Sequence, residues 1–488
     1  MKKKNKIYFL LIYNMYTFYS NLFDKKIKEI NNKYQKRNSE EVTKELLAEN
    51  KLNINPYKIP NELRNLLKSP IYTIDPEGCT DADDGFSIFK QGDTIVLSIH
   101  IADPTDYISI RSNLWKDIRK RGVTCYPSNT EPIHLLPSEI LRQCTLRPNN
   151  GETSGIRPTI SISVEIDGDT FLPKDDTAQL FFRTIEVEKK YTFTYEEASE
   201  TSLIDEGIKI AEAIERKRGS IGSVLNSEPV TTIKYIDGFP VLKKDTEKVR
   251  RVKNMIAQFA IYANSFIGEY LSKNLDKLGI FRTCDASDLE GGVSKSDLLN
   301  SIVKDGIQAD YKHVPEAHDL VGIEKYSHFT SPMRRVSDMY VHYLLKYIYL
   351  KKNDVLGDKI MVPFEKEELR IVSEECHIIS KMNRKINRDD TKFRLIQYMF
   401  INKPVEISVK FTNYIKERFF NCMITKINGF DVALSITFKV TRCEVIPWNQ
   451  YREFKTTITN IFPFKKFDSD IFPSLYEGCI PFFLKSKM

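Results

Sequence analysis

Four carboxylates crowd into one short stretch of the chain: Asp75, Asp81, Asp83 and Asp84. The flanking residues predict a strand ending near Ile74, a turn at 76–78 and a return strand over 86–89. Like charges held this close repel one another unless a cation lies among them. Mg²⁺ takes hard oxygen ligands, often one or two carboxylates per ion, and two such ions about 3.5–4 Å apart can cleave a phosphodiester. The stretch therefore indicates a magnesium site, with Mn²⁺ as the alternative ion.

Two other interpretations of the aspartates stay open at this point. Aspartates are common in turns simply because their side chains cap the backbone there. A calcium-binding loop fits less well, because counting from Asp81 puts Gly85 and Gly92 at the positions that require Asp and Glu. Taken alone, the aspartates suggest a metal site without establishing one.

A second segment far downstream also carries chemistry. Ser331 and Pro332 interrupt the chain, and apolar residues at helical spacing predict a helix from about 336 to 352, with Asp338 and His342 on one face. Arg334 and Arg335 come just before this helix. Helix-start N–H groups and an arginine fork both favour a phosphate. The alternative is a surface arginine pair ahead of a capped helix.

Together, the segments 72–86 and 326–342 resemble the two most recognisable stretches of the RNB family, which includes bacterial ribonucleases II and R and the catalytic exosome subunit of eukaryotes. Further motifs follow in the family's order: Ser98–Thr105, Leu135–Pro137, Cys144–Pro148 and Thr194–Ala198. The resemblance covers roughly residues 70 to 400. It implies an α/β fold of the α+β type, with largely antiparallel sheets covered by helices.

The resemblance also implies an activity. Members hydrolyse single-stranded RNA from the 3′ end, release nucleoside 5′-monophosphates and depend on a divalent metal. By motif position, Asp75 and Asp84 would be the first metal ligands, and Asp81 and Asp83 would complete the cluster. Arg334 matches the family's catalytic arginine.

Four further residues are predicted to contact RNA: Tyr126, Tyr195, Ser331 and Arg335. Tyr195 matches a tyrosine that holds the terminal nucleotide, and we count it among the catalytic residues. Tyr126 lies where the family has a base-stacking aromatic, and stacking tolerates any base. An ordinary half-buried tyrosine is the other interpretation of Tyr126.

Three positions depart from the family pattern. Ala257 and Gln258 stand where the family has a pair of acidic residues, and Asn387 stands where it has a glutamate. The aspartates and Arg334 are retained, so an active but altered enzyme is favoured. The alternatives are a non-catalytic RNA-binding protein that retains the fold, and a hydrolase of another phosphodiester such as DNA.

Length and composition agree with a nucleic-acid enzyme without requiring one. The 488 residues leave room for a large catalytic domain and small flanking ones. We predict an N-terminal extension at 1–69, a catalytic domain at 70–402 and a divergent S1-like or OB-like barrel at 403–488. The formal charge is +7, and the eight cysteines form no CxxC pattern, which argues against zinc and for a reducing compartment.

The N-terminus combines Lys2–Lys4 with a short apolar run, as in a targeting segment. The run is too short to predict a membrane span, so no stable membrane insertion is expected. A cytoplasmic location is the default and an organelle is the alternative. Residues 24–68 predict one or two charged helices and lack the alternation of an OB-fold, so an N-terminal RNA clamp is expected to be absent or replaced. Nothing in the sequence identifies a partner complex.

Overall fold

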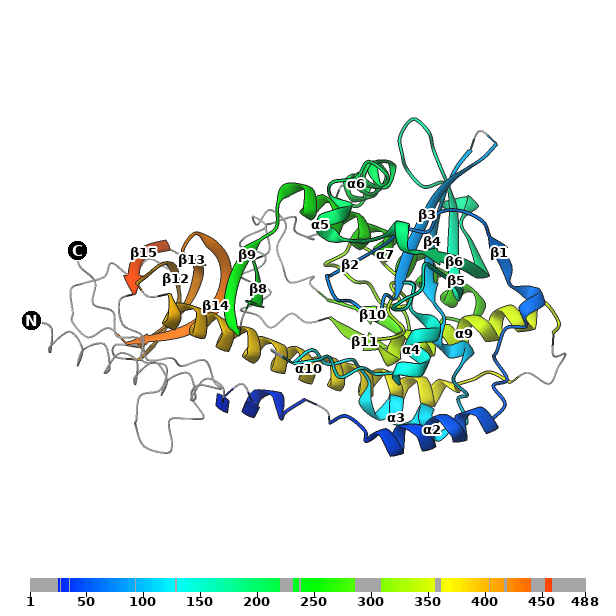
Figure 1. Cartoon of the computed structure of the whole chain (residues 1–488), viewed down its shortest axis with the longest axis horizontal. Helices are drawn as coiled ribbons and strands as arrows, with labels where there is room; N and C mark the ends of the chain where they lie inside the picture. The colour runs from blue at the N-terminus through cyan, green and yellow to red at the C-terminus, as the bar shows by residue number, and fades with distance from the viewer. Residues whose placement is uncertain are drawn as a thin grey trace, which may run out of the picture.

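The computed structural model describes residues 25–458, except 27, 35, 93, 128–129, 220–230, 237, 286–308, 356–360, 403, 417–418 and 440–452. The largest sheet among these residues has five strands in the order β1–β6–β5–β4–β3 and lies at the upper right in Figure 1. All neighbouring strands are antiparallel except β1 and β6. The strands are β1 (Asn65–Leu67), β3 (Asp84–Gln91), β4 (Thr94–Ala102), β5 (Ser154–Ile166) and β6 (Gln179–Glu188). The expected antiparallel sheet is therefore confirmed.

One face of this sheet packs on long helices. Alternation along the strands turns Phe86 and Phe182 to the same face, where Phe86 meets Phe259 of α7 (Glu247–Asn274) at 5.2 Å between ring centroids. Phe182 meets Tyr349 of α9 (Val336–Lys352) at 4.6 Å. Helix α9 spans the residues that the sequence predicts, because its apolar residues recur at helical spacing.

The opposite face of the sheet is polar and yet buried. Ser87, His100 and Ser161 lie side by side on β3, β4 and β5 and are fully buried. His100 Nε2 lies 3.0 Å from Ser87 Oγ, and its Nδ1 lies 2.8 Å from Ser161 Oγ. Burial lowers the pKa of His100 to about 3, so the imidazole stays neutral and each ring nitrogen has a partner, as burial of polar atoms requires.

Smaller elements surround the sheet. The remaining helices are α2 (Glu40–Leu52), α3 (Asn113–Arg121), α4 (Ser138–Cys144), α5 (Tyr195–Ala198), α6 (Asp205–Gly219) and α10 (Lys366–Ile401). The short paired strands are β2 (Thr73–Asp75) with β7 (Thr192–Thr194), β8 (Thr231–Ile236) with β9 (Phe239–Lys244), and β10 (Phe281–Thr283) with β11 (Asp310–Lys312). Helix α10 runs from the sheet-bearing part of the molecule to the C-terminal strands (Figure 1).

The C-terminal strands form a sheet of order β14–β13–β12–β15. They are β12 (Val405–Lys416), β13 (Phe419–Ile427), β14 (Phe430–Lys439) and β15 (Glu453–Ile458). Asn428 and Gly429, with φ of 48° and 79°, make the tight turn that the Asn-Gly pair predicts. The described strands form an antiparallel sheet, and closure into a barrel stays a prediction, as do the three domain boundaries. Residues 1–24, with the expected targeting segment, lie outside the described residues.

No helix in the described part of the chain is both long enough and apolar enough to cross a membrane. The cysteines within that part are free thiols.

Candidate active site

The aspartate loop joins the end of β2 to the start of β3, so Asp75 and Asp84 lie at two adjoining strand ends. Tyr72 and Phe86 exchange both backbone hydrogen bonds, at 2.8 and 2.9 Å, and this holds the strand ends together. Gly85 permits the close approach, because a Cβ there would lie 3.1 Å from Tyr72 O. The sequence prediction of strand, turn and return strand is confirmed.

Asp75 and Asp84 have the electrostatics of carboxylates that lack a counter-ion. Burial, and next the charge of Asp84, raise the pKa of Asp75 to about 7. Burial raises the pKa of Asp84 to about 6, although Arg334 and Arg335 oppose the shift. Asp75 Oδ2 is buried without a hydrogen-bond partner. A bound cation would compensate both charges, so these two residues fit a divalent metal.

The other two aspartates are already engaged. Asp83 Oδ1 accepts a 2.7 Å hydrogen bond from Met333 N, and Asp83 Oδ2 lies 3.3 Å from Arg334 Nε. Asp81 Oδ2 lies 3.3 Å from His134 Nδ1 and accepts a long hydrogen bond, 3.4 Å, from Tyr126 Oη. Within the described ranges, no three Asp, Glu, His or Cys side chains come together as a ready-made metal cage. Mg²⁺ needs none, because it commonly uses one or two carboxylates and leaves its other positions to water or substrate phosphates.

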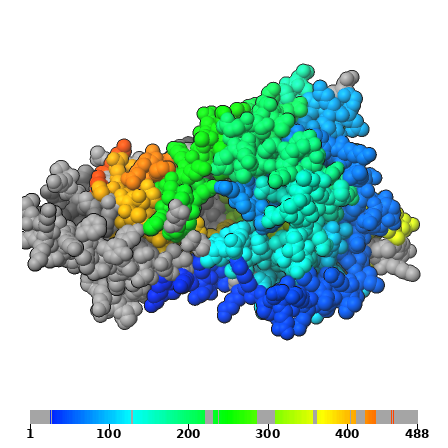
Figure 2. Space-filling model, in the orientation of Figure 1, coloured from blue at the N-terminus to red at the C-terminus, as the bar shows by residue number. Residues whose placement is uncertain are grey.

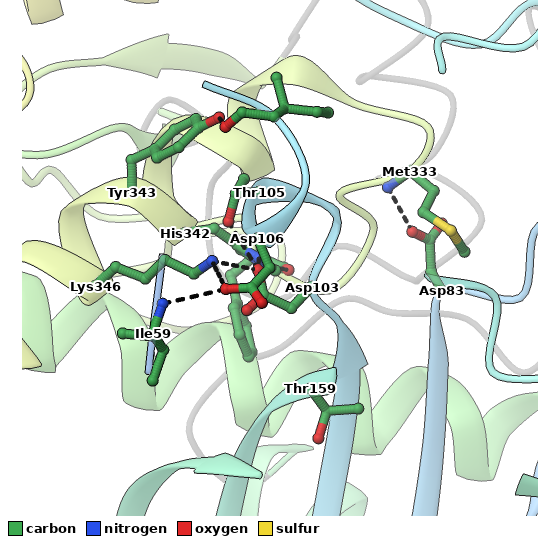
Figure 3. A network of polar contacts seen from close by, with 12 residues as sticks. Ile59, Asp83, Asp103, Thr105, Asp106, Thr159, Met333, His342, Tyr343 and Lys346 are labelled. Atoms are coloured by element: carbon green, nitrogen blue, oxygen red, sulfur yellow. Dashed lines mark hydrogen bonds and ion pairs between the residues drawn. The ribbon is translucent and has the colours of Figure 1, made fainter. Parts of the chain in front are cut away.

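The contact between Asp83 and Met333 joins segments 250 residues apart in the chain (Figure 3). It brings the arginine pair to the aspartate loop. Arg334 is the available cation of that pair, since its side chain keeps 47% of its surface exposed. Its guanidinium therefore lies at the edge of the carboxylates and can reach a phosphate bound there.

Arg335 has a different position. Its Nε and Nη2 donate to the two oxygens of Asp338, at 2.9 and 2.7 Å, and Asp338 Oδ1 also accepts from Ser331 N at 2.8 Å. Asp338 is fully buried and Ser331 is 2% exposed. Ser331 and Arg335 thus fix the loop that presents Arg334, and a direct RNA contact by either of them stays a prediction. Of the two arginine side chains, that of Arg334 is the more exposed, at 47% against 22% for Arg335, and phosphate binding by either one stays a prediction.

The two predicted nucleotide-binding tyrosines both lie near the carboxylates. Tyr195 begins α5 beside a capping box made by Thr194 and Glu197. Burial and then the charge of Asp75 raise its pKa, and Lys253 Nζ lies 5.1 Å from its ring centroid. Tyr126 is 43% exposed, so part of it is accessible to a nucleotide, and stacking on its ring stays a prediction.

Two site residues escaped the sequence analysis. His134 contacts Asp81, and Arg147 donates from Nη1 to Cys79 O at 3.2 Å and from Nη2 to Phe193 O at 3.3 Å, tying the aspartate loop to β7. The signal was available, because His134 directly precedes the Leu135–Pro137 motif and Arg147 lies inside the Cys144–Pro148 motif.

Two of the positions that depart from the family pattern, Gln258 and Asn387, make hydrogen bonds inside the structure, whereas Ala257 is exposed. Gln258 is 2% exposed, accepts from Arg218 Nη2 at 2.7 Å and donates to Asn254 Oδ1 at 3.0 Å. Asn387 Oδ1 accepts a 2.8 Å hydrogen bond from Tyr34 Oη. Both amides therefore have structural partners within the chain.

Comparison with known proteins shows which sequences and folds this chain resembles. The RNB domain profile matches residues 61–299 and 293–351. Ribonuclease R of Thermotoga maritima is 24% identical over 430 residues, which cover 77% of this chain and 56% of that protein. The chloroplastic/mitochondrial ribonuclease II of Arabidopsis thaliana is 23% identical over 391 residues, covering 74% of this chain and 45% of the relative. The chain thus spans about half the length of these curated relatives.

Solved structures share the fold. Mycoplasma genitalium RNase R, in complex with ribose-methylated single-stranded RNA, superposes with a TM-score of 0.69 at 18% identity, over 90% of this chain and 76% of that one. Yeast Ssd1, described as a pseudonuclease, superposes with a TM-score of 0.58 at 18% identity, over 77% of this chain and 50% of Ssd1. At these identities, the likeness establishes the fold alone.

Proposed function

Because the chain belongs to the RNB domain family, we propose that it is a metal-dependent 3′–5′ exoribonuclease that hydrolyses single-stranded RNA to nucleoside 5′-monophosphates. The observation that carries the proposal is the meeting of Arg334 with the aspartate loop through the bond from Met333 N to Asp83. That contact gives one site both the carboxylates for a cation and a guanidinium for a phosphate.

Each residue has a chemical task in this proposal. Asp75 and Asp84 would hold the ion, with Asp81 and Asp83 completing the predicted cluster. A bound Mg²⁺ or Mn²⁺ would supply positive charge at the scissile phosphate and lower the pKa of a bound water. Arg334 would neutralise charge developing on the phosphate oxygens, because its guanidinium stays protonated and is already oriented by Asp83. Tyr126 and Tyr195 would hold the terminal nucleotides.

A non-catalytic RNA-binding role is the second candidate. It is favoured by the fold shared with a pseudonuclease and by the amides at Gln258 and Asn387. It accounts less well for the raised pKa values of Asp75 and Asp84. A protein that binds no cation has no use for two buried carboxylates, and neutral residues at these positions would remove their unfavourable burial.

A cleavage assay separates the candidates. Single-stranded RNA and DNA of one sequence, labelled at the 5′ end, are incubated with the protein in Mg²⁺, Mn²⁺ or EDTA. The proposal requires RNA to shorten stepwise from the 3′ end with a metal only, and mononucleotides to accumulate. Binding without cleavage supports the non-catalytic role, and equal cleavage of DNA points to another phosphodiesterase. An organellar location is a separate proposal, tested by fusing residues 1–69 to a fluorescent protein.

A further inference from the structure

A segment ahead of the catalytic sheet is anchored on α10. Ile30 and Tyr34 are buried, with 3% and 4% of their surfaces exposed, and they share one apolar cluster with Ile386 and Phe393 of α10. Tyr34 Oη also donates to Asn387 Oδ1 at 2.8 Å. In Figure 1 this dark-blue segment runs beside α10 before reaching α2. The described residues 30–34 and 36–38, here called the strap, are therefore held against α10 at their N-terminal end.

The other end of the strap contacts the base of a loop. Arg37 Nη2 donates to two backbone carbonyls, Glu131 O at 2.5 Å and Pro132 O at 3.0 Å. Asn38, next to Arg37, donates from Nδ2 to Asp117 Oδ2 of α3 at 3.1 Å, and this bond also holds the strap in place. A guanidinium is well suited to this task, because its several donors point in fixed directions.

That loop, of which residues 125–127 and 130–133 are described, is closed at its base by two hydrogen bonds. Cys125 N donates to Ile133 O at 3.0 Å, and Ile133 N donates to Cys125 O at 2.8 Å. Tyr126 follows the first of these residues and His134 follows the second. Both side chains converge on Asp81 Oδ2, at 3.4 and 3.3 Å. Arg37 thus binds the backbone of Pro132, two residues before His134.

We propose that the strap positions this loop, and that Arg37 is the positioning residue that sets Tyr126 and His134 over Asp81. The proposal rests on the proposed function, in which Tyr126 holds the nucleotide being removed. Its physical basis is orientation, since a misplacement of about 1 Å at an active site can cost about 10²-fold in rate. The strap itself touches neither the carboxylates nor Arg334 in any of the contacts described above.

The first arm of the test needs no substrate. Hydrogen exchange is measured on peptides covering residues 123–136 in Arg37→Ala and in the matched control Lys36→Ala, which removes an exposed neighbouring cation. We expect faster exchange at the amides of Cys125 and Ile133 in Arg37→Ala only, with the global melting temperature nearly unchanged. Tyr34→Phe, which keeps the ring but loses the bond to Asn387, should have a smaller effect in the same direction.

The second arm is a double-mutant cycle between Arg37→Ala and Tyr126→Ala on a short single-stranded RNA. Loss of a hydrogen bond from a charged donor predicts about a tenfold rise in KM for Arg37→Ala. If Arg37 acts through the loop, that rise should nearly vanish in the Tyr126→Ala background. Arg37→Lys, which keeps one donor, should restore part of the wild-type KM, whereas Lys36→Ala should leave it unchanged.

Unchanged hydrogen exchange at Cys125 and Ile133 in Arg37→Ala would overturn the proposal that the strap positions the loop. So would additive effects in the cycle, which would mean that Arg37 contacts RNA independently of the loop. If the wild-type protein cleaves no RNA, it is the exonuclease proposal that fails. The cycle is then read from the fluorescence of 2-aminopurine at the 3′ end of bound RNA, and the exchange arm is unaffected.

Discussion

At the scale of single residues, neighbours in the sequence have been given different tasks. Arg334 and Arg335 are adjacent, but one guanidinium borders the carboxylates and the other is forked onto buried Asp338. Asp83 and Asp84 are adjacent too, and of the two it is Asp83 that accepts a backbone hydrogen bond from residues 329–335, here called the arginine loop.

The arginine pair gives the first prediction. Arg334→Lys keeps the charge but loses the planar fork, so kcat should fall by as much as about 10²–10³-fold, the typical cost of a lost oxyanion donor. Arg335→Lys should instead lower the melting temperature, because the two-pronged contact with Asp338 is lost. Single-turnover kinetics and thermal melts on both variants measure this. Equal losses of kcat at equal stability would contradict the division.

The metal gives the second prediction. Asp84→Asn removes one negative charge at nearly constant shape. Mutating a residue that only supports a metal ligand costs up to about 100-fold in activity, so losing a ligand itself should lower kcat in Mg²⁺ by at least about 100-fold. Mn²⁺ binding followed by calorimetry should weaken in parallel, while RNA affinity in EDTA should persist. Asp176→Asn, at an exposed aspartate, is the control. A variant that still binds Mn²⁺ and turns over normally would remove Asp84 from the ligands.

At the scale of elements, α9 connects the site to the core. His342 Nε2 lies 2.9 Å from Phe329 O, at the start of the arginine loop. One turn further, Lys346 Nζ lies 2.9 Å from Asp103 Oδ1 and 3.1 Å from Asp106 Oδ1 (Figure 3). Arg64 Nη2 contacts the same two aspartates at 2.6 and 2.9 Å. Burial alone would raise the pKa of Asp103, but Lys346 and then Arg64 hold it far below its ordinary value.

This buried network gives the third prediction. Lys346→Met leaves the aspartates with one cation fewer, and breaking a buried pair typically costs about 3–5 kcal/mol of unfolding free energy. Lys351→Met, on the exposed end of the same helix, should change it by less than about 0.5 kcal/mol. Urea unfolding at neutral pH compares the two. Equal unfolding free energies for both variants would mean that Arg64 alone compensates the charges of Asp103 and Asp106.

The segment that precedes the arginine loop packs closely against α7 at a glycine. A Cβ on Gly268 of α7 would lie 2.2 Å from Lys325 O, so glycine lets the segment before the arginine loop cross this helix. Asn264, one turn earlier on α7, accepts from Phe329 N at 2.9 Å and donates to Tyr326 Oη at 3.0 Å. Contacts from both α7 and α9 therefore hold the arginine loop.

At the scale of the whole molecule, the C-terminal sheet and the catalytic part meet along α10. A single apolar cluster joins Ile30, Leu242, Phe393 and Ile424, which belong to the strap, the β8–β9 hairpin, α10 and β13. Figure 2 shows a hollow in this face of the molecule, bordered by the green hairpin and the cyan region that contains α4. Deleting the C-terminal sheet would expose this cluster, so point variants are the better probes of RNA binding.

Helix α10 offers such probes. Four exposed cations share one of its faces, and in the described part of the chain none has an acidic partner within 4 Å: Lys381, Arg384, Lys385 and Arg388. Unmatched like charges on one helix face are unfavourable, and a polyanion would compensate them.

The fourth prediction concerns salt. If these cations contact phosphates, log Kobs for single-stranded RNA should fall linearly with log salt, with a slope of about −0.7 per contact. Arg384→Gln combined with Arg388→Gln should make the slope shallower by about 1.4, two contacts at that value. Fluorescence anisotropy at several KCl concentrations measures it. Lys366→Gln, at the exposed start of the same helix, should leave the slope unchanged, and an equal change there would indicate a general charge effect.

Local sequence pattern alone predicted several secondary-structure elements and the motifs of the candidate site. The helix at 336–352, the Asn428–Gly429 turn and the strands around the aspartate loop all follow from periodicity and turn chemistry, which act over a few residues. The motifs also led to the RNB family, which the match over residues 61–299 and 293–351 confirms.

Only the tertiary structure decided which side chains share a site. The bond between Met333 and Asp83, the pairing of Tyr34 with Asn387 and the grip of Arg37 on Pro132 join residues far apart in the chain. No periodicity encodes such contacts, because they arise when packed elements bring distant backbone and side-chain groups together. The same cause separates Arg334 from Arg335, since burial of Asp338 beneath the loop selects one guanidinium and leaves the other exposed.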